Sequence, residues 1–344
     1  MSSVLEKIRG LAPKTTEQKL AALLLVATLA YGFRSAEEVK ALRKKEAEEV
    51  SVTGKAQRRP SAERWQDHPV GSWFVTNASV LTAVLLKTRL VGDLKQSDSF
   101  ALTFFKMMAT NVVMVDSCVV WHQFLINKLY AHVPFFSDKR LPRTAGDAIT
   151  DYLRCNLVAN SIMGMIQVYA FRRKPAEVVL AKEGPWRPLR FLMRLVWMRV
   201  WVDVVFWLGH KVLHMKYVYQ YNHRTHHEHS ATQITTNYHF DWWDLIIEAS
   251  IPFLVGGGLY EGLVGPIDQF DQALIATYVF WHEMASHAGK PLPTMPLLGP
   301  LSTWTQKYDD FNVWFHEVHH RTLKSNFSIT PWFDQLMGTD RWTL

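Results

Sequence analysis

The sequence has little cysteine: Cys118 and Cys155 are the only two in 344 residues, and both lie in apolar stretches. Two cysteines exclude a disulfide framework and a metal site built from several thiolates. The pattern of a cleaved secretory signal is also missing, because the apolar stretch from Leu20 to Phe33 follows a mixed-charge segment and has no convincing cleavage site. We expect that stretch to form a short membrane-associated helix.

Strand patterns and nucleotide-binding motifs are scarce as well. Alternation of apolar and polar residues is nearly absent, so the sequence predicts a helical protein. The glycine run 256–258 fits neither a P-loop nor a dinucleotide fingerprint, and its apolar surroundings indicate a packing site between helices. The net charge of +7 comes with no nucleic-acid motif. Basic residues such as those at 172–174 instead lie beside apolar runs, as at the cytoplasmic ends of membrane helices.

Long apolar runs are present, but none is a clean span of about eighteen apolar residues. Polar residues such as Asp116 and Glu248 interrupt them. Fourteen tryptophans, many near the ends of the runs, are typical of an interfacial aromatic belt and favour a membrane protein with several helical spans. The runs occupy residues 71–92, 101–121, 191–209, 245–265 and 268–285.

Histidine is abundant in one region, because twelve of the fifteen histidines lie between residues 210 and 320. Most of them fall into three clusters: His210 with His214; His223 with His226 and His227; and His316 with His319 and His320. Neutral imidazole offers a strong nitrogen lone pair, so spaced histidines indicate a transition-metal site.

The spacing of three or four residues places two histidines of each cluster on one face of a helix, while an adjacent histidine is rotated by about 100°. That adjacent residue can serve a second ion. A further element, His282 to His287, raises the number of clustered imidazoles to ten. Ten nitrogens exceed what one ion can bind, so the sequence predicts two ions, each with about four or five nitrogens and an open position.

The clusters follow the order HxxxH, HxxHH and HxxHH, and in this they resemble the integral-membrane fatty acid hydroxylase and sterol desaturase superfamily. Asp203 and Trp207 are similar to the aspartate and tryptophan that precede the family's first box. The tail from Asn326 through Asp334 to Gly338 is similar to the family's closing segment, although Phe333 stands directly before the aspartate here. The specific resemblance covers about 200–344.

The resemblance implies a di-iron centre that activates O2 to attack a C–H bond of a lipid. In eukaryotic members the electrons come from cytochrome b5 or a similar reductase system, and the usual location is the endoplasmic reticulum membrane. The ligands that the resemblance implies are His210, His214, His223, His226, His227, His316, His319 and His320, together with His287 of a His-x-Gly element. His282 matches only family branches that have a histidine pair at this place.

Two further residues are candidates for catalytic support. His239 lies twelve residues after the second box, where many relatives have a histidine, and we expect it to orient a ligand or to bind metal itself. Asp203 is an acid inside an apolar run and needs a partner. We expect Asp203 to accept a hydrogen bond from a ligand imidazole.

These observations divide the chain into three parts. Residues 1–66 are predicted to hold the N-terminal helix and a charged linker, and residues 67–200 the membrane helices. Residues 201–344 are predicted to form a cytosolic, helical histidine-box region that binds metal and includes a membrane hairpin near 245–285. The predicted fold class is therefore all-α: a multi-span helical membrane protein with this cytosolic region.

Two other functions fit parts of the pattern. His316-Glu317-Val-His319-His320 also satisfies HExxH, in which Glu317 would be the general base of a membrane zinc metalloprotease. That motif leaves the other two clusters unexplained. A transporter or storage protein that binds metal without chemistry is the second alternative, although transporters usually place ionisable residues within their spans. The sequence does not decide between sterol, sphingoid and fatty acyl substrates, or between hydroxylation and desaturation.

Overall fold

The computed structural model describes residues 69–137, 140, 144–172, 187–292 and 313–342. The elements in these ranges are helices, with no strand among the described residues, so the helical prediction is confirmed there. The predicted N-terminal helix and charged linker at 1–66 lie outside the described residues.

The first described part of the chain forms helices, two of which begin at clear capping residues. The side chain of Ser99 accepts a hydrogen bond from the backbone N–H of Leu102, and Thr144 and Asp147 form a capping box. The helices are α3 (Pro69–Leu90), α4 (Phe100–Phe124) with its π-helical continuation η2 (Leu125–Leu129), α5 (Ala145–Arg154) with its π-helical continuation η3 (Cys155–Ala159), and α6 (Asn160–Arg172).

The second part carries the histidine clusters. Its long first helix, α7 (Arg187–Leu213), runs without a break across the boundary that the sequence predicts at residue 200. The other elements are α8 (Lys216–Asn222), the 3-10 helices η5 (His226–Glu228) and η6 (Ile234–Tyr238), α9 (Trp242–Asp244), the π-helical η7 (Leu245–Ser250), α10 (Ile251–Leu263), α11 (Gln269–Ser286), helical residues 313–322, and α13 (Pro331–Met337).

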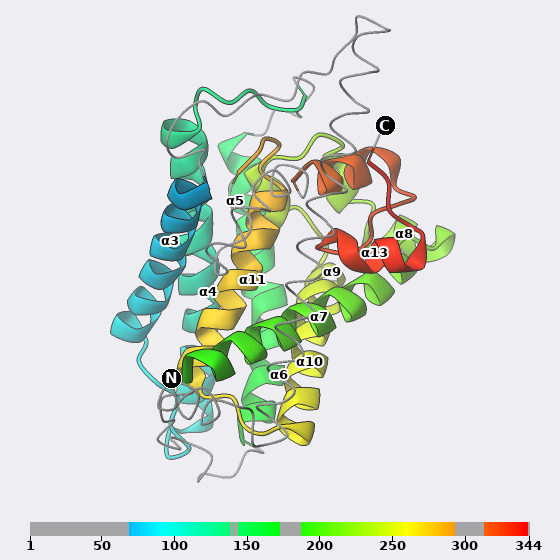
Figure 1. Cartoon of the computed structure of the whole chain (residues 1–344). Coiled ribbons are helices and arrows are strands. Elements are labelled where there is room, and N and C mark those ends of the chain that lie inside the picture. Colours follow the sequence, from blue (N-terminus) through cyan, green and yellow to red (C-terminus); the bar gives the residue numbers. More distant parts are fainter. Residues whose placement is uncertain (1–68, 138–139, 141–143, 173–186, 293–312, 343–344) are drawn as a thin grey trace, which may run out of the picture.

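Helix α11 lies in the middle of the molecule, between α3 and α4 on one side and α7 on the other (Figure 1). Its Trp281 is fully buried in the main apolar core. Helices α7 and α10 pack closely at Gly256, where an added Cβ would lie 3.3 Å from Met198 Sδ and from Trp201 Cβ. The prediction that this glycine run is a packing site is confirmed at Gly256. The two helical parts therefore share one core.

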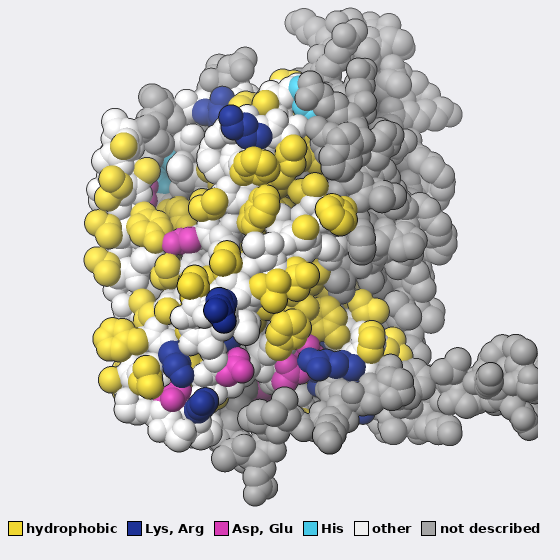
Figure 2. Space-filling model, turned by 90° about the vertical axis from the view of Figure 1, so that its left-hand side faces the viewer, with side chains coloured by type: hydrophobic (Ala, Val, Ile, Leu, Met, Phe, Trp, Pro, Cys, Tyr) yellow, Lys and Arg dark blue, Asp and Glu magenta, His cyan; other side chains and the backbone are white. Residues whose placement is uncertain are grey.

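Among the described residues, one helix is long and apolar enough to cross a membrane, the stretch Phe100–Leu129. Helices α10 and α11 form a helical pair joined at residues 264–268, within the predicted hairpin. Large apolar side chains are exposed on the neighbouring helices, including Leu85 and Leu90 of α3 and Phe105 of α4, the last with 66% of its surface exposed. Figure 2 shows hydrophobic side chains spread over one face of the molecule, with charged side chains mainly toward its lower and upper ends.

Candidate metal centre

Nine of the ten histidines predicted as metal ligands lie in two groups. In the first, the five-histidine group, one ring nitrogen from each residue lies within 4.8 Å of the others. The second, the four-histidine group, meets the same criterion. The five-histidine group consists of His210, His214, His223, His227 and His319, and the four-histidine group consists of His226, His287, His316 and His320.

In the five-histidine group the Nε2 atoms face one another at short distances. His210 Nε2 lies 3.0 Å from His223 Nε2 and 3.2 Å from His214 Nε2. His227 Nε2 lies 3.0 Å from His223 Nε2 and 3.3 Å from His319 Nε2. His210 and His214 belong to α7 and the turn that follows it, and their spacing of four residues brings both rings to one side.

The four-histidine group is built in the same way from three distant segments. His287, directly after α11, places its Nε2 3.2 Å from His226 Nε2 and 2.8 Å from His316 Nε2. His316 and His320 are one helical turn apart, and their Nε2 atoms are 3.1 Å apart. The turn after His287 needs Gly289, which has a φ of +69° and approaches the carbonyl oxygen of Thr232 too closely for any Cβ.

Adjacent histidines are divided between the two groups. His226 belongs to the four-histidine group and His227 to the five-histidine group. Likewise, His320 belongs to the four-histidine group and His319 to the five-histidine group. Neighbouring side chains on a helix point about 100° apart, so one backbone segment can serve two separate sites. The sequence prediction that the adjacent histidine could serve a second ion agrees with this arrangement.

Burial keeps these imidazoles uncharged. It lowers the pKa of His287 and His319 to about 4, and burial together with the neighbouring His319 lowers the pKa of His214 to about 2. The pKa values of His226 and His320 are also well below the usual value, for the same main cause. Each ring therefore carries one N–H and one lone pair at neutral pH.

Oxygen atoms on the far side of the rings decide which nitrogen carries the hydrogen. A carbonyl oxygen only accepts, so an Nδ1 that faces one donates its hydrogen and leaves Nε2 with the lone pair. Five of the nine rings are held in this way, and a sixth, His223, faces the Asp244 carboxyl at 3.2 Å. The five pairs are His210 to Phe327 O (2.8 Å), His226 to His239 O (3.3 Å), His287 to Glu283 O (3.0 Å), His319 to Ser325 O (2.6 Å) and His320 to His229 O (3.1 Å).

Lone pairs that face each other at about 3 Å repel one another unless a cation lies between them. Two nitrogens that bind one ion at about 2.1 Å lie about 3.0 Å apart at a right angle and about 3.4 Å apart at a tetrahedral angle. The observed Nε2 distances of 2.8 to 3.3 Å span most of this range. The donor set therefore fits a metal ion in each group, and histidine nitrogen suits iron, zinc and copper.

His282 lies outside both groups. Its Nε2 is 3.2 Å from the carbonyl oxygen of Ile329, and its Nδ1 is 3.4 Å from Arg199. His282 lies on α11 five residues before His287, which is not a whole number of helical turns, so the two rings point in different directions. The structure therefore brings together nine of the predicted ligands and leaves the tenth bonded to the C-terminal segment.

Asp203 does not bind a ligand imidazole, in contrast to the sequence expectation. Its Oδ2 accepts hydrogen bonds from the Thr330 hydroxyl and from Trp332 Nε1, the latter at 2.6 Å. The reason is that the C-terminal segment folds back over α7 and supplies donors nearer than any histidine. Asp203 thereby fixes the segment that contains Phe327, whose carbonyl oxygen accepts the hydrogen of His210 Nδ1.

His239 orients a ligand through its backbone. Its carbonyl oxygen faces His226 Nδ1 at 3.3 Å. Its ring contacts two carboxylates, with Nδ1 2.9 Å from Asp151 and Nε2 3.0 Å from Glu228, and stacks on His229. The side chain therefore lies outside both groups, while the backbone supports the four-histidine group.

Two carboxyl groups beside the five-histidine group were not among the predicted site residues. Asp244 Oδ1 is hydrogen-bonded to His223 Nδ1 at 3.2 Å, and Glu248 Oε1 lies 3.5 Å from His210 Nε2. Both acids lie at the start of an apolar run, where a carboxylate needs a partner. The position of an acid within an apolar run, which made Asp203 a candidate in the sequence, is shared by Glu248.

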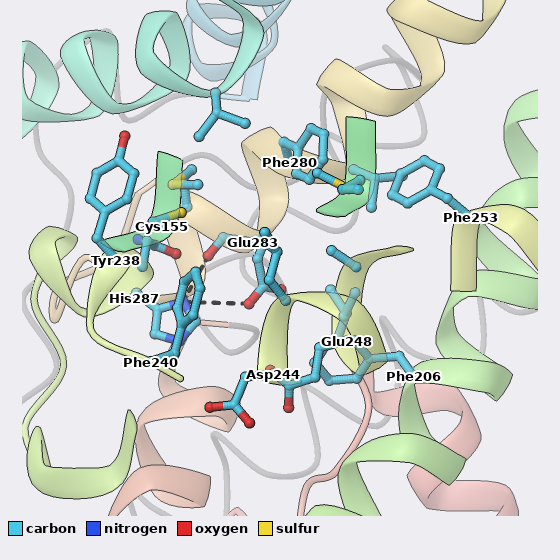
Figure 3. Close-up of a pocket in the computed structure, with 18 of the residues that line it drawn as sticks. Cys155, Phe206, Tyr238, Phe240, Asp244, Glu248, Phe253, Phe280, Glu283 and His287 are labelled. Carbon is cyan, nitrogen blue, oxygen red and sulfur yellow. Dashed lines mark hydrogen bonds and ion pairs between the residues drawn. The ribbon is translucent and has the colours of Figure 1, made fainter. Parts of the chain in front are cut away.

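A largely apolar pocket adjoins the metal centre. Its walls come from α4, α6, α7, η6, η7 and α11, and it reaches His226 and His287 of the four-histidine group. In Figure 3 the carboxyl group of Glu283 lies next to His287, whereas Phe253 and Phe280 lie farther from it. The apolar pocket is therefore open to the nitrogen donors of the four-histidine group.

Comparisons with known proteins match the region that holds this centre. The sequence model of the fatty acid hydroxylase family matches residues 195–339. Methylsterol monooxygenase 1 of Gallus gallus is 28% identical over 137 residues, which cover 38% of this chain and 40% of that protein. A very-long-chain aldehyde decarbonylase of Oryza sativa subsp. indica is 30% identical over 154 residues, covering 40% of this chain and 48% of that protein.

A third relative, fatty acid hydroxylase domain-containing protein 2 of Macaca fascicularis, is 25% identical over 151 residues, 44% of this chain and 39% of that protein. The chain thus spans about two fifths to one half of the length of these relatives. No solved structure matches the chain. All nine histidines of the two groups lie inside the matched region. Residues 195–339, which include the histidine-box region of this chain, are therefore similar to the fatty acid hydroxylase family.

Proposed function

We propose that the protein is an O2-dependent di-iron oxidase that hydroxylates or desaturates a C–H bond of a lipid. The observation that carries the proposal is the placement of nine histidines in two groups beside an apolar pocket. The names of two relatives support a lipid substrate, because one is a methylsterol monooxygenase and the other a very-long-chain aldehyde decarbonylase. Sterol, sphingoid and fatty acyl substrates all fit the proposal.

Iron held by the two groups would supply the redox chemistry by which O2 attacks an unactivated C–H bond. The protein's own part is to keep the Nε2 lone pairs free and aimed inward. Low pKa values keep the rings neutral, and oxygen acceptors such as Phe327 O and Ser325 O hold the Nδ1 hydrogens away from the centre.

The pocket positions the lipid. Aromatic side chains of Phe206, Phe253 and Phe280 exclude water and pack against an alkyl chain or ring system. His226 and His287, on the wall of the same pocket, bring the bound substrate next to the four-histidine group. Which hydrogen is removed depends on substrate placement at a scale of about 1 Å, and this decides between hydroxylation and desaturation.

We place the protein in a membrane, with several helical spans and the histidine region on the cytosolic side. Helix Phe100–Leu129 and the exposed apolar side chains of α3 and α4 support membrane contact, because soluble proteins rarely expose such large apolar patches. In a eukaryotic cell the endoplasmic reticulum membrane is the proposed location. Cytochrome b5 or a reductase is the proposed electron donor.

The zinc protease alternative requires Glu317 to act as a general base. The Glu317 carboxylate is buried and accepts hydrogen bonds from the Thr232 N–H (2.9 Å), the Thr232 hydroxyl (2.6 Å) and Arg321. These partners tie the helical residues 313–322 to the segment after the second histidine cluster. A carboxylate occupied in this way is a structural group, so the geometry favours the oxidase.

Lipid profiling by mass spectrometry tests the proposed function. Cells that lack the protein are compared with cells that express the wild type, Glu317→Gln or His316→Ala. The wild type and Glu317→Gln should each produce a lipid that has gained one oxygen atom or lost two hydrogen atoms, and His316→Ala should not. Activity in protein that contains zinc alone, or the loss of activity only in Glu317→Gln, would refute the oxidase.

Cysteine labelling in sealed vesicles tests the topology. Ser230 and Lys324 are exposed and follow the second and third histidine clusters. Because the native Cys118 and Cys155 are buried, they give a low background. Cysteines introduced at Ser230 and Lys324 should react from the same, cytosolic side. Labelling from opposite sides would contradict a shared centre.

A further inference from the structure

Glu248 has a buried carboxylate oxygen without a hydrogen-bond donor among the described residues. Its Oε1 is inaccessible to solvent, and its side chain is only 16% exposed. A buried carboxylate oxygen is costly unless a donor or a cation compensates for it. Two ring nitrogens lie close to it, His210 Nε2 at 3.5 Å and His223 Nε2 at 3.8 Å.

His210 Nε2 does not supply a hydrogen, because its Nδ1 donates to Phe327 O and the neutral ring then presents the Nε2 lone pair toward Glu248. The Nε2 atoms of His210 and His223 are 3.0 Å apart, and the Glu248 oxygen converges on the same space. A cation placed in this space would interact favourably with all three atoms.

The local structure brings Glu248 to this position. Glu248 lies in the π-helical η7, and an extra residue in a helical turn rotates the side chains that follow it. Helix α7 packs on η7 at Gly209, where an added Cβ would lie 2.6 Å from Ile247 Cγ2. The close approach at Gly209 and Ile247 sets the neighbouring His210 and Glu248 side by side.

We propose that Glu248 supplies an oxygen ligand to the ion that binds in the five-histidine group. The inference rests on the proposed metal centre and extends it. Five nitrogens and one carboxylate oxygen make six donors, a set that suits an ion such as Fe²⁺, Mn²⁺ or Co²⁺. The carboxylate would also offset part of the positive charge, which neutral imidazoles do not.

Glu283 provides a matched control on the same pocket. It too is a largely buried glutamate that lines the pocket, but its Oε1 is 3.6 Å from His287 Nδ1, the nitrogen on the far side of the ring from the four-histidine group. Its backbone oxygen accepts the hydrogen of that same Nδ1. Glu283 is therefore the same side chain in a similarly enclosed place, but its carboxyl group faces Nδ1 of His287 and not the Nε2 atoms.

The test is a Co²⁺ titration of the full-length, metal-free protein in detergent, followed by visible absorption, whose bands report the ligands of bound Co²⁺. The variants Glu248→Gln and Glu283→Gln keep side-chain size and remove the charge. Glu248→Gln should weaken one Co²⁺ site by at least about tenfold and shift its bands, whereas Glu283→Gln should match the wild type. Circular dichroism confirms that both variants keep their helices.

A second pair of variants identifies the affected site. In the His316→Ala background, where the four-histidine group is broken, Glu248→Gln should weaken the remaining Co²⁺ site. Wild-type affinities and bands in Glu248→Gln, or an equal loss in Glu283→Gln, would overturn the inference. Uptake of fewer than two Co²⁺ ions by the wild type would instead count against the proposed two-ion centre.

Discussion

The two histidine groups differ in how the chain assembles them. Four of the five residues in the five-histidine group come from one continuous stretch, residues 210–227, and two carboxylates lie beside them. The four-histidine group draws on three segments that are far apart in sequence, and all four of its residues are buried. Three of its Nδ1 atoms face backbone carbonyls. One group depends mainly on local spacing, and the other depends on the whole fold.

This difference predicts unequal tolerance to ligand loss. His316→Ala leaves three nitrogens in the four-histidine group, whereas His319→Ala leaves four in the other. In His316→Ala we expect the four-histidine group to lose its ion, because its metal affinity falls by about 100-fold or more. In His319→Ala the five-histidine group should still bind its ion, but with a lower affinity. Both variants should lose activity, because the proposed chemistry needs both ions. Elemental analysis after purification measures the difference, and equal metal loss in the two variants would contradict it.

The next largest effect concerns the carboxylate beside the five-histidine group. Asp244→Asn keeps the shape of the side chain but weakens its hydrogen bond to His223 Nδ1. We expect the affinity of the five-histidine group to fall by about 10-fold to 100-fold, with a smaller change at the other group. Competition with a coloured chelator measures both affinities. An equal loss at the four-histidine group would show that Asp244 acts on the fold as a whole.

Acid should destabilise the metal-free protein through both groups. The folded-state pKa values of His287 and His319 are lowered to about 4 from the usual 6.5. The unfolded chain therefore binds more protons below pH 6.5, so stability is full above that pH and falls as the pH drops toward 4. Thermal unfolding midpoints of the metal-free protein between pH 7 and pH 4.5 should fall steadily. A midpoint that stays constant over this interval would contradict the low pKa values.

The smallest expected effect is that of Glu317→Gln. Glutamine can still accept from Thr232, but the pairing with Arg321 is weakened, so we expect a stability loss of about 1–3 kcal/mol. Activity and metal content should remain close to wild type, because Glu317 is not a member of either group. Unfolding in denaturant and lipid turnover measure the two effects separately.

The sequence carried enough information for the helical fold and for the set of imidazoles. Helical spacing and the division of His226 from His227 follow from 3.6 residues per turn, so local geometry was sufficient. Local spacing could not show that His287 joins a histidine group and His282 does not. That outcome depends on how the turn after α11, at Gly289, packs against Thr232.

The partners of the acids depended on the tertiary structure. Asp203 was expected to hold an imidazole, but the C-terminal segment brings Thr330 and Trp332 to it. Glu248 was visible in the sequence only as a polar interruption of an apolar run. A π-helical turn, which no residue pattern announces, places it beside His210.

The division of adjacent histidines between the groups would couple two bound ions through the backbone. His226 is bonded to His227, and His319 to His320, so each pair carries one ligand for each ion. An ion that fills one group fixes the backbone on which the other group depends, and the entropy of ordering that backbone is then already lost. We expect the two proposed ions to load cooperatively, and such coupling is reciprocal: each ion raises the affinity for the other by the same factor.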